Sequence, residues 1–80
     1  MTSAFVFIQI SIPGGMGDAN AIHKALHAVE GVKTVHFLAG PIDVIAFVEA
    51  ADQQAMMQTI GKLRTVKGVV STDTRIVLPL

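Results

Sequence analysis

Two short stretches of the same pattern decide the fold, Val29-Glu30-Gly31-Val32 and Val66-Lys67-Gly68-Val69. In each, a glycine follows apolar residues at helical spacing and comes directly before a run of β-branched residues. This order is typical of a helix that ends at a glycine and passes into a strand. The two glycines lie 37 residues apart, at positions 31 and 68. The sequence therefore predicts two helix-to-strand units of one design.

Each predicted helix has a start signal before its apolar stripe. Asp18 and Asp52 are placed to cap the two N-termini. Gly61, inside the second helix, costs about 1 kcal/mol relative to alanine, so we expect it to mark a close packing contact. The apolar stripes that follow the two caps are Ala19, Ile22, Ala25, Leu26 and Val29, and then Met56, Ile60 and Leu63.

Four stretches rich in β-branched and aromatic residues predict strands over 5–12, 32–39, 42–49 and 69–78. The order of elements is then β-α-β-β-α-β. The 37-residue offset also places Ile8 and Ile10 of the first strand on Ile45 and Phe47 of the third. Two β-α-β halves related in this way give an α+β, ferredoxin-like fold, an antiparallel sheet with both helices on one face.

The composition indicates a partner for the other face of that sheet. The 80 residues form one domain, 1–80, and 51% of them are hydrophobic. The mean hydropathy of +0.59 is high for so small a chain. No apolar run approaches the roughly 18 residues of a membrane span. The third strand offers apolar side chains on both sides, so we expect a homodimer, a dimeric α/β barrel, that covers the open face.

The charges and the lack of cysteine exclude several functions. Six basic residues balance six acidic ones and no basic cluster occurs, so direct nucleic-acid binding is not expected. Without cysteine there is no disulfide, thiolate nucleophile or cysteine-based zinc site. The N-terminus lacks a basic flank and a cleavage site, so a cytoplasmic location is expected.

Few side chains suggest chemistry. His23 and His27 have the i, i+4 spacing of paired metal ligands, but we interpret them as solvent-exposed and expect no metal or cofactor. His36 is interpreted as a packed residue. Asp43, beside the Gly40-Pro41 turn, either caps that turn or contacts a ligand. Residues 71–74, Ser-Thr-Asp-Thr, would be solvated on an exposed edge, or form the polar end of a pocket at a subunit seam.

These motifs together resemble a known family. The sequence Gly40-Pro41-Ile42-Asp43-Val44, the cap Asp52, and residues 66–78 resemble the effector-binding (RAM) domain of the Lrp/AsnC transcriptional regulators. The resemblance spans nearly the whole chain. Ile42 departs from the pattern, because the family usually has an aromatic residue there.

The resemblance implies a fold, an assembly and a site. Such domains have the fold derived above, form dimers through their sheets, and often assemble into octamer-like rings in which amino acids bind where dimers meet. It implies an effector pocket lined by Gly40, Ile42, Asp43, Ser71, Thr72 and Thr74. We expect a stand-alone version without the helix-turn-helix domain, which regulates amino-acid metabolism or transcription through other proteins, among them full-length regulators of the family. No catalytic residue is expected.

Two alternatives share the topology. The loop Ile12-Pro13-Gly14-Gly15 suggests an ACT domain, which would bind an amino acid near that loop. A small dimeric α+β barrel enzyme of the monooxygenase type would use the cleft between the helices and the sheet. His36 is the residue we would nominate for such an enzyme, and the lack of an acid-base pair argues against it.

Overall fold

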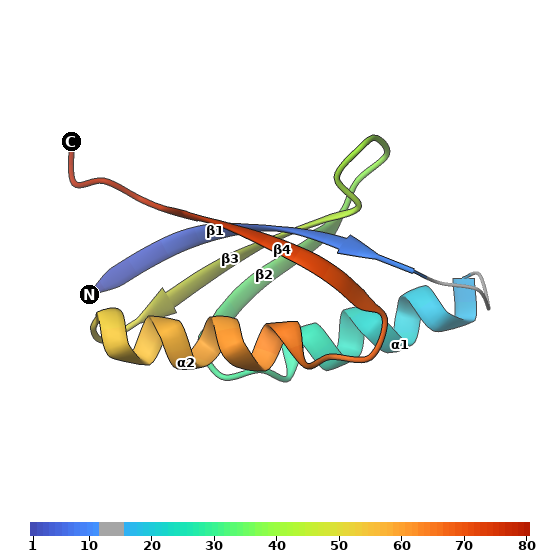
Figure 1. Ribbon diagram of the computed structural model, residues 1–80, viewed down its shortest axis with the longest axis horizontal. Helices are drawn as coiled ribbons and strands as arrows, with labels where there is room; N and C mark the ends of the chain where they lie inside the picture. The colour runs from blue at the N-terminus through green and yellow to red at the C-terminus, as the bar shows by residue number, and fades with distance from the viewer. Residues whose placement is uncertain (12–15) are drawn as a thin grey trace.

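The computed structural model describes residues 1–11 and 16–80. The elements are β1 (Thr2–Ile10), α1 (Met16–His27), β2 (Val32–Phe37), β3 (Val44–Ala50), α2 (Gln53–Arg64) and β4 (Val69–Ile76). They confirm the predicted order β-α-β-β-α-β. Both helices lie on the same side of a four-stranded sheet (Figure 1). All three strand pairs are antiparallel.

The strand order is β2-β3-β1-β4, so β1 and β3 are central and β2 and β4 form the edges. Side chains of the central strands alternate between the helices and the opposite side. Ala4, Val6 and Ile8 of β1 are fully buried, as are their partners on β3. The side chains that alternate with them lie on the opposite side, which we call the open face.

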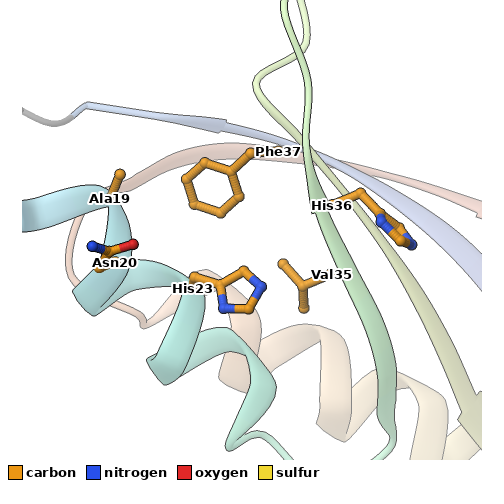
Figure 2. Close-up of a pocket in the computed structure, with 6 residues that line it drawn as sticks. All are labelled: Ala19, Asn20, His23, Val35, His36 and Phe37. Atoms are coloured by element: carbon orange, nitrogen blue, oxygen red, sulfur yellow. The ribbon is translucent and has the colours of Figure 1, made fainter. Parts of the chain in front are cut away.

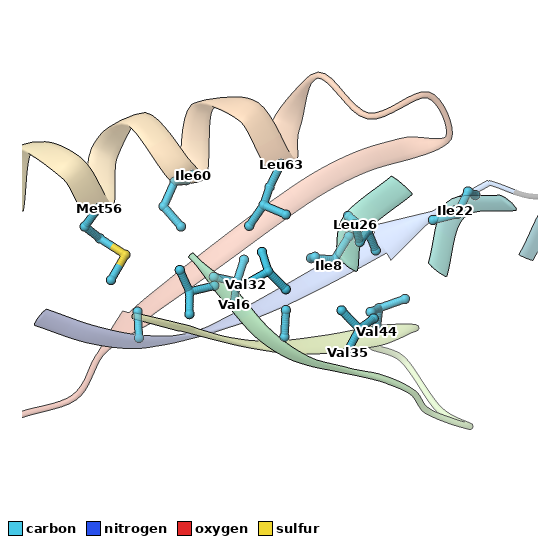
Figure 3. Packing of buried hydrophobic residues seen from close by; sticks show 13 residues of the cluster. Val6, Ile8, Ile22, Leu26, Val32, Val35, Val44, Met56, Ile60 and Leu63 are labelled. Carbon is cyan, nitrogen blue, oxygen red and sulfur yellow. The ribbon is translucent and has the colours of Figure 1, made fainter. Parts of the chain in front are cut away.

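The core lies between the sheet and the two helices (Figure 3). Ile22 and Leu26 reach it from α1, and Met56, Ile60 and Leu63 reach it from α2. Each such aliphatic side chain stabilises the fold by roughly 1.5–3 kcal/mol when it is fully buried. The predicted helical stripes therefore mark the faces that hold the helices on the sheet.

The helix starts differ in how well they were predicted. Asp52 is the N-cap of α2, with extended backbone, and its Oδ1 atom accepts the Ala55 N–H at 2.8 Å. The prediction for Asp18 was wrong, because α1 begins at Met16 and Asp18 lies in its first turn. An acidic side chain at either position suits the helix dipole, so composition alone does not separate the two.

The strand ends also differ from the prediction. β1 begins at Thr2. β2 ends at Phe37 and β3 begins at Val44, because residues 38–43 form a loop in which the Leu38 N–H donates to the Asp43 carbonyl at 2.7 Å. β4 ends at Ile76. The predicted end of the first strand, at residue 12, lies outside the described residues.

The internal repeat is confirmed in the backbone of its two glycines, and two predictions about it are corrected. The helices end four residues before the glycines, at His27 and Arg64, so the prediction that the glycines end the helices was wrong. Gly31 and Gly68 have φ values of 99° and 100°. The Gly31 carbonyl accepts the Glu49 N–H at 2.9 Å, and the Gly68 carbonyl accepts the Ser11 N–H at 2.8 Å. Ser11 and Glu49 are 38 residues apart, so β1 is shifted by one residue relative to the rest of the repeat. The predicted match of Ile8 with Ile45 was therefore wrong, and the two side chains lie on opposite faces of the sheet.

Gly61 is a second correction. A Cβ atom built on it would meet no atom within 4 Å, so Gly61 marks no close contact. It lies on the exposed side of α2.

Candidate functional site

The Gly40–Asp43 turn is joined to the end of β1 by side-chain hydrogen bonds. The Oδ2 atom of Asp43 accepts the backbone N–H of Ile10 at 2.9 Å. The Nε2 atom of Gln9 donates to the carbonyl of Pro41 at 3.2 Å. The loop between β2 and β3 is therefore held against the C-terminal end of β1.

Gln9 extends this connection to the other edge of the sheet. Its Oε1 atom accepts the Ser71 hydroxyl at 3.0 Å, while its Nε2 atom is used by Pro41. One amide thus links the turn to β4 across β1. We call Gln9, the Gly40–Asp43 turn and Ser71 the Gln9 cluster. It is polar, and Asp43 has no cationic partner among the residues that the structure describes.

The structure separates the predicted residues of the last strand. Ser71 pairs with Gln9, whereas Thr72 and Thr74 pair with Ile8 and Val6, two core residues. The two threonines are half-buried and lie on the helix side of β4. Of the predicted effector residues, the single chain therefore brings together Gly40, Ile42, Asp43 and Ser71, and places Thr72 and Thr74 on the other face.

Gln9 is the residue that the sequence reasoning missed. It is the lone polar side chain in the otherwise apolar run from Phe5 to Ile10. An isolated amide in an apolar strand is a candidate for side-chain hydrogen bonds on the face where it lies. This signal would have marked Gln9, although it would not have named its partners.

The middle of the open face is aromatic. The rings of Phe5 and Phe47 lie 5.0 Å apart, and the Arg75 guanidinium lies 5.8 Å from the Phe7 ring centroid. Phe5 is 41% exposed even though it belongs to a central strand. Isolated exposed apolar residues are common, but adjoining aromatic rings on the uncovered side of a sheet indicate a contact surface.

An exposed ion pair lies on the same face. The Arg75 guanidinium donates two hydrogen bonds to the Asp73 carboxylate, both at 3.0 Å. This hydrogen bonding holds the pKa of the Asp73 carboxyl below its ordinary value, and it raises the pKa of Arg75. Both groups are exposed, so their pairing affects the charge pattern of the face more than the stability of the chain.

The three histidines lie apart from the Gln9 cluster. His23 and His27 are exposed on α1, as expected. His36 is exposed rather than packed, which corrects the interpretation made from the sequence. A groove of about 380 Å³ lies between α1 and β2 and is lined by Ala19, Asn20, His23, Val35, His36 and Phe37. Figure 2 shows that the ring of His36 points away from this groove.

Metal-ligating side chains are scattered over residues 1–11 and 16–80. In that part of the chain no set of three or more histidine or acidic side chains is placed to hold a metal ion. The loop that carries the ACT alternative, residues 12–15, lies outside the described residues. The Gln9 cluster combines a carboxylate, an amide and a hydroxyl on one patch, and such groups recognise small polar ligands.

A comparison with protein families identifies the type of domain. The family described as the Lrp/AsnC ligand binding domain matches residues 4–79. The chain belongs to the Lrp/AsnC ligand-binding domain family. The predicted family and fold are thus confirmed. The Gln9 cluster is a polar patch on a domain of a ligand-binding family.

Solved structures place the Lrp/AsnC fold over the whole chain. A protein of Thermus thermophilus, TTHA0845, has a TM-score of 0.84 and 25% identity, with 100% of this chain and 96% of that chain covered. A structure described as a transcriptional regulator has a TM-score of 0.79 and 29% identity. This chain covers 52% of that regulator and is itself covered over its full length. Lrp/AsnC-type domains thus occur both in chains of similar length and within longer ones.

A curated relative is an enzyme. The homocitrate synthase of Sulfurisphaera tokodaii is 41% identical to this chain over 58 residues, which are 72% of this chain and 13% of the synthase. The chain thus spans about an eighth of the curated relatives that it matches.

In the described residues of this Lrp/AsnC domain, no helix has the length and hydropathy needed to cross a membrane.

Proposed function

We propose that this chain is an effector-binding module that binds an amino acid at the Gln9 cluster and regulates a protein partner. The observation that carries the proposal is the position of the cluster. The family-type turn and the polar start of β4 meet at Gln9, on one end of the open face of a ligand-binding domain. Binding of an effector, rather than catalysis, suits a patch that has no acid-base pair.

The groups of the cluster match the two ends of an amino acid. The Asp43 carboxylate and the Pro41 carbonyl are acceptors and suit the ligand's ammonium group. The Gln9 amide nitrogen donates one N–H to Pro41 and keeps a second N–H for the ligand's carboxylate. The Ser71 hydroxyl can donate to the same carboxylate when it turns away from the Gln9 Oε1 atom. Gly40 and Ile42 belong to the same turn and complete the wall. Thr72 and Thr74 would contact a ligand only if it also reached the other side of β4.

Asp43 is the residue to test first. Asp43→Asn keeps an oxygen that can accept the Ile10 N–H but removes the charge, so the turn should stay folded. We expect amino-acid affinity to fall by about 1.5–3 kcal/mol, the value of a hydrogen bond to a charged group. Native mass spectrometry with an amino-acid mixture would identify the ligand, and isothermal titration would give the change.

Two controls make this result clear. Asp73→Asn removes a carboxylate of the same face that lies outside the cluster and should leave the affinity nearly unchanged. Thermal melts of both variants would show whether the fold is intact. If Asp43→Asn binds the ligand as well as the parent chain does, Asp43 serves only to hold the turn.

We also propose that the open face forms a homodimer, and that dimers can associate further. The exposed Phe5 ring packed on Phe47 supports this contact. Phe5→Glu should yield monomers in sedimentation velocity at micromolar concentration. Met57→Glu is the matched control, because Met57 is 65% exposed on α2, away from that face. Equal sedimentation of the two variants would contradict the proposed interface.

A transcriptional regulator is one type of partner. Since this chain has no basic cluster, we propose that it acts through full-length regulators rather than by contact with DNA. Mixed rings of the chain and such a regulator, detected by native mass spectrometry, would support this role. Absence of exchange between the two would contradict it.

An enzyme is a second type of partner, favoured by the homocitrate synthase match. A chimeric synthase whose matching segment is replaced by the corresponding residues of this chain would test it. If the amino acid bound by this chain then changes the activity of the chimera, the module can regulate an enzyme directly. An active chimera that does not respond would favour the regulator.

A further inference from the structure

Two of the three histidines form a pair on α1, and His23 also lines the groove between this helix and β2. His23 and His27 are separated by one turn of the helix, and their ring centroids lie 5.0 Å apart with a tilt of 53°. Side chains at i and i+4 lie on the same face of a helix. The two imidazoles are therefore neighbours that open to solvent on the same side.

Neither imidazole is used elsewhere in the described part of the chain. No hydrogen bond or ion pair joins His23 or His27 to another of those residues. Each ring therefore keeps a nitrogen lone pair available as a metal ligand. The Phe37 ring lies 5.8 Å from His23 and limits the space that this imidazole can occupy (Figure 2).

The position on the helix also favours a cation. His27 is the last residue of α1. The C-terminal end of a helix carries partial negative charge, which stabilises a positive ion bound within the last turn. In a chain without cysteine, imidazole nitrogens are the softest side-chain ligands apart from methionine sulfur.

We propose that His23 and His27 together bind one transition-metal cation, with Cu²⁺ held most tightly and Ni²⁺ and Zn²⁺ held more weakly. This order follows the general affinity series for nitrogen ligands. Among the described residues no third histidine or acidic side chain joins the pair, so water fills the remaining positions and the ion exchanges readily. The site is separate from the Gln9 cluster and does not depend on amino-acid binding.

Titration of the purified chain with CuCl₂ tests the site. We expect one Cu²⁺ per chain, with nitrogen couplings in its electron paramagnetic resonance spectrum. Changes outside the ligand shell of metal sites already cost about 10–100-fold in affinity, so loss of a direct ligand in His23→Gln or His27→Gln should cost tenfold or more. Both side chains are exposed, so neither variant should unfold the chain, and far-ultraviolet circular dichroism checks this.

His36→Gln is the matched control, since His36 is the third histidine and is exposed on the other side of the sheet. It should bind Cu²⁺ as the parent chain does. Addition of Cu²⁺ should also raise the melting temperature of the parent chain, but not that of a double variant that carries both His23→Gln and His27→Gln. The proposal is wrong if the parent chain binds no Cu²⁺, if the double variant binds it equally well, or if His36→Gln loses as much affinity as His27→Gln.

Discussion

The turns at Gly31 and Gly68 have the same backbone and different surroundings. In both, a glycine with φ near +100° lies four residues after the end of a helix and directly before a strand, and its carbonyl accepts an N–H from the end of a central strand or the residue after it. A methyl group added to Gly31 would lie 3.0 Å from the Glu49 carbonyl oxygen. The same addition at Gly68 would lie 2.6 Å from Ile22 Cδ1, the flexible tip of a side chain. Equal geometry therefore does not mean equal tolerance.

The neighbours of the two turns differ in polarity as well. Thr59 occupies, by the 37-residue repeat, the place that Ile22 holds in the first half. Its hydroxyl lies 3.2 Å from both the Glu30 and Ala55 carbonyl oxygens, to which it can donate. The hollow beside Gly31 also carries Gln58 and Lys62, where the hollow beside Gly68 has two alanines. The repeated backbone thus accepts either a polar or an apolar lining.

Gly31→Ala should have the largest effect. A positive φ costs a residue with a side chain about 1–2 kcal/mol. A methyl group against a fixed backbone oxygen adds about 1–3 kcal/mol. We expect the free energy of unfolding in urea to fall by about 2–5 kcal/mol. A loss below about 1 kcal/mol would mean that the turn at Gly31 can relax around a methyl group. It would contradict the claim that this turn tolerates a side chain less well than the turn at Gly68.

Gly68→Ala should cost less, about 1–3 kcal/mol, because Ile22 can move its tip away. Ile22→Val removes the Cδ1 atom. In a double-mutant cycle it should reduce the destabilisation caused by Gly68→Ala by about 1 kcal/mol. Thr59→Ser is the matched partner change at the other turn. It should not reduce the destabilisation caused by Gly31→Ala, because the Glu49 carbonyl oxygen remains in place. Equal coupling at both turns would remove the distinction between them.

Thr59→Val would give the Gly31 turn an apolar neighbour like that of Gly68. The buried hydroxyl and its hydrogen bond are lost, so we expect unfolding to become easier by about 0.5–1.5 kcal/mol. Thr59→Ser keeps the hydroxyl and serves as the control for the hydrogen bond. If the valine variant is more stable than the parent chain, the polar lining reduces the stability of this turn and is better explained by function.

Gly61→Ala should have the smallest effect and the opposite sign. This glycine has open space around it and lies inside α2, so it needs no special backbone conformation. Alanine should raise the free energy of unfolding by about 0.5–1 kcal/mol. The same substitution would then destabilise the chain at two glycines and stabilise it at a third. A loss of stability would contradict the open space found around Gly61.

The sequence predicted the parts of the fold that depend on local pattern. The repeated valine–glycine stretches, the Asp52 cap and the apolar stripes of the helices sufficed for the order of elements. The slip of β1 by one residue was not predicted, because β-branched and aromatic residues occupy both faces of that strand. With Ile8 and Phe7 both apolar, the pattern does not say which side chain faces the helices.

The candidate site was predicted in part, for a related reason. The turn with Asp43 and the polar start of β4 do lie together, through Gln9. Thr72 and Thr74 were grouped with Ser71 because they are adjacent in sequence, although alternation along a strand places neighbours on opposite faces. The residue that joins the cluster lies 62 positions from Ser71, and such a pairing depends on the whole sheet.

The strand order has a consequence for folding. Within each β-α-β half the two strands are not neighbours, because a strand of the other half lies between β1 and β2, and another between β3 and β4. Neither half has a sheet of its own, so each half must receive a strand from the other. A chain cut in the 38–43 loop would yield two fragments that fold only on meeting, with a rate that rises with their concentration. The intact chain avoids that dependence, since the loop keeps two mutually required halves permanently at high effective concentration.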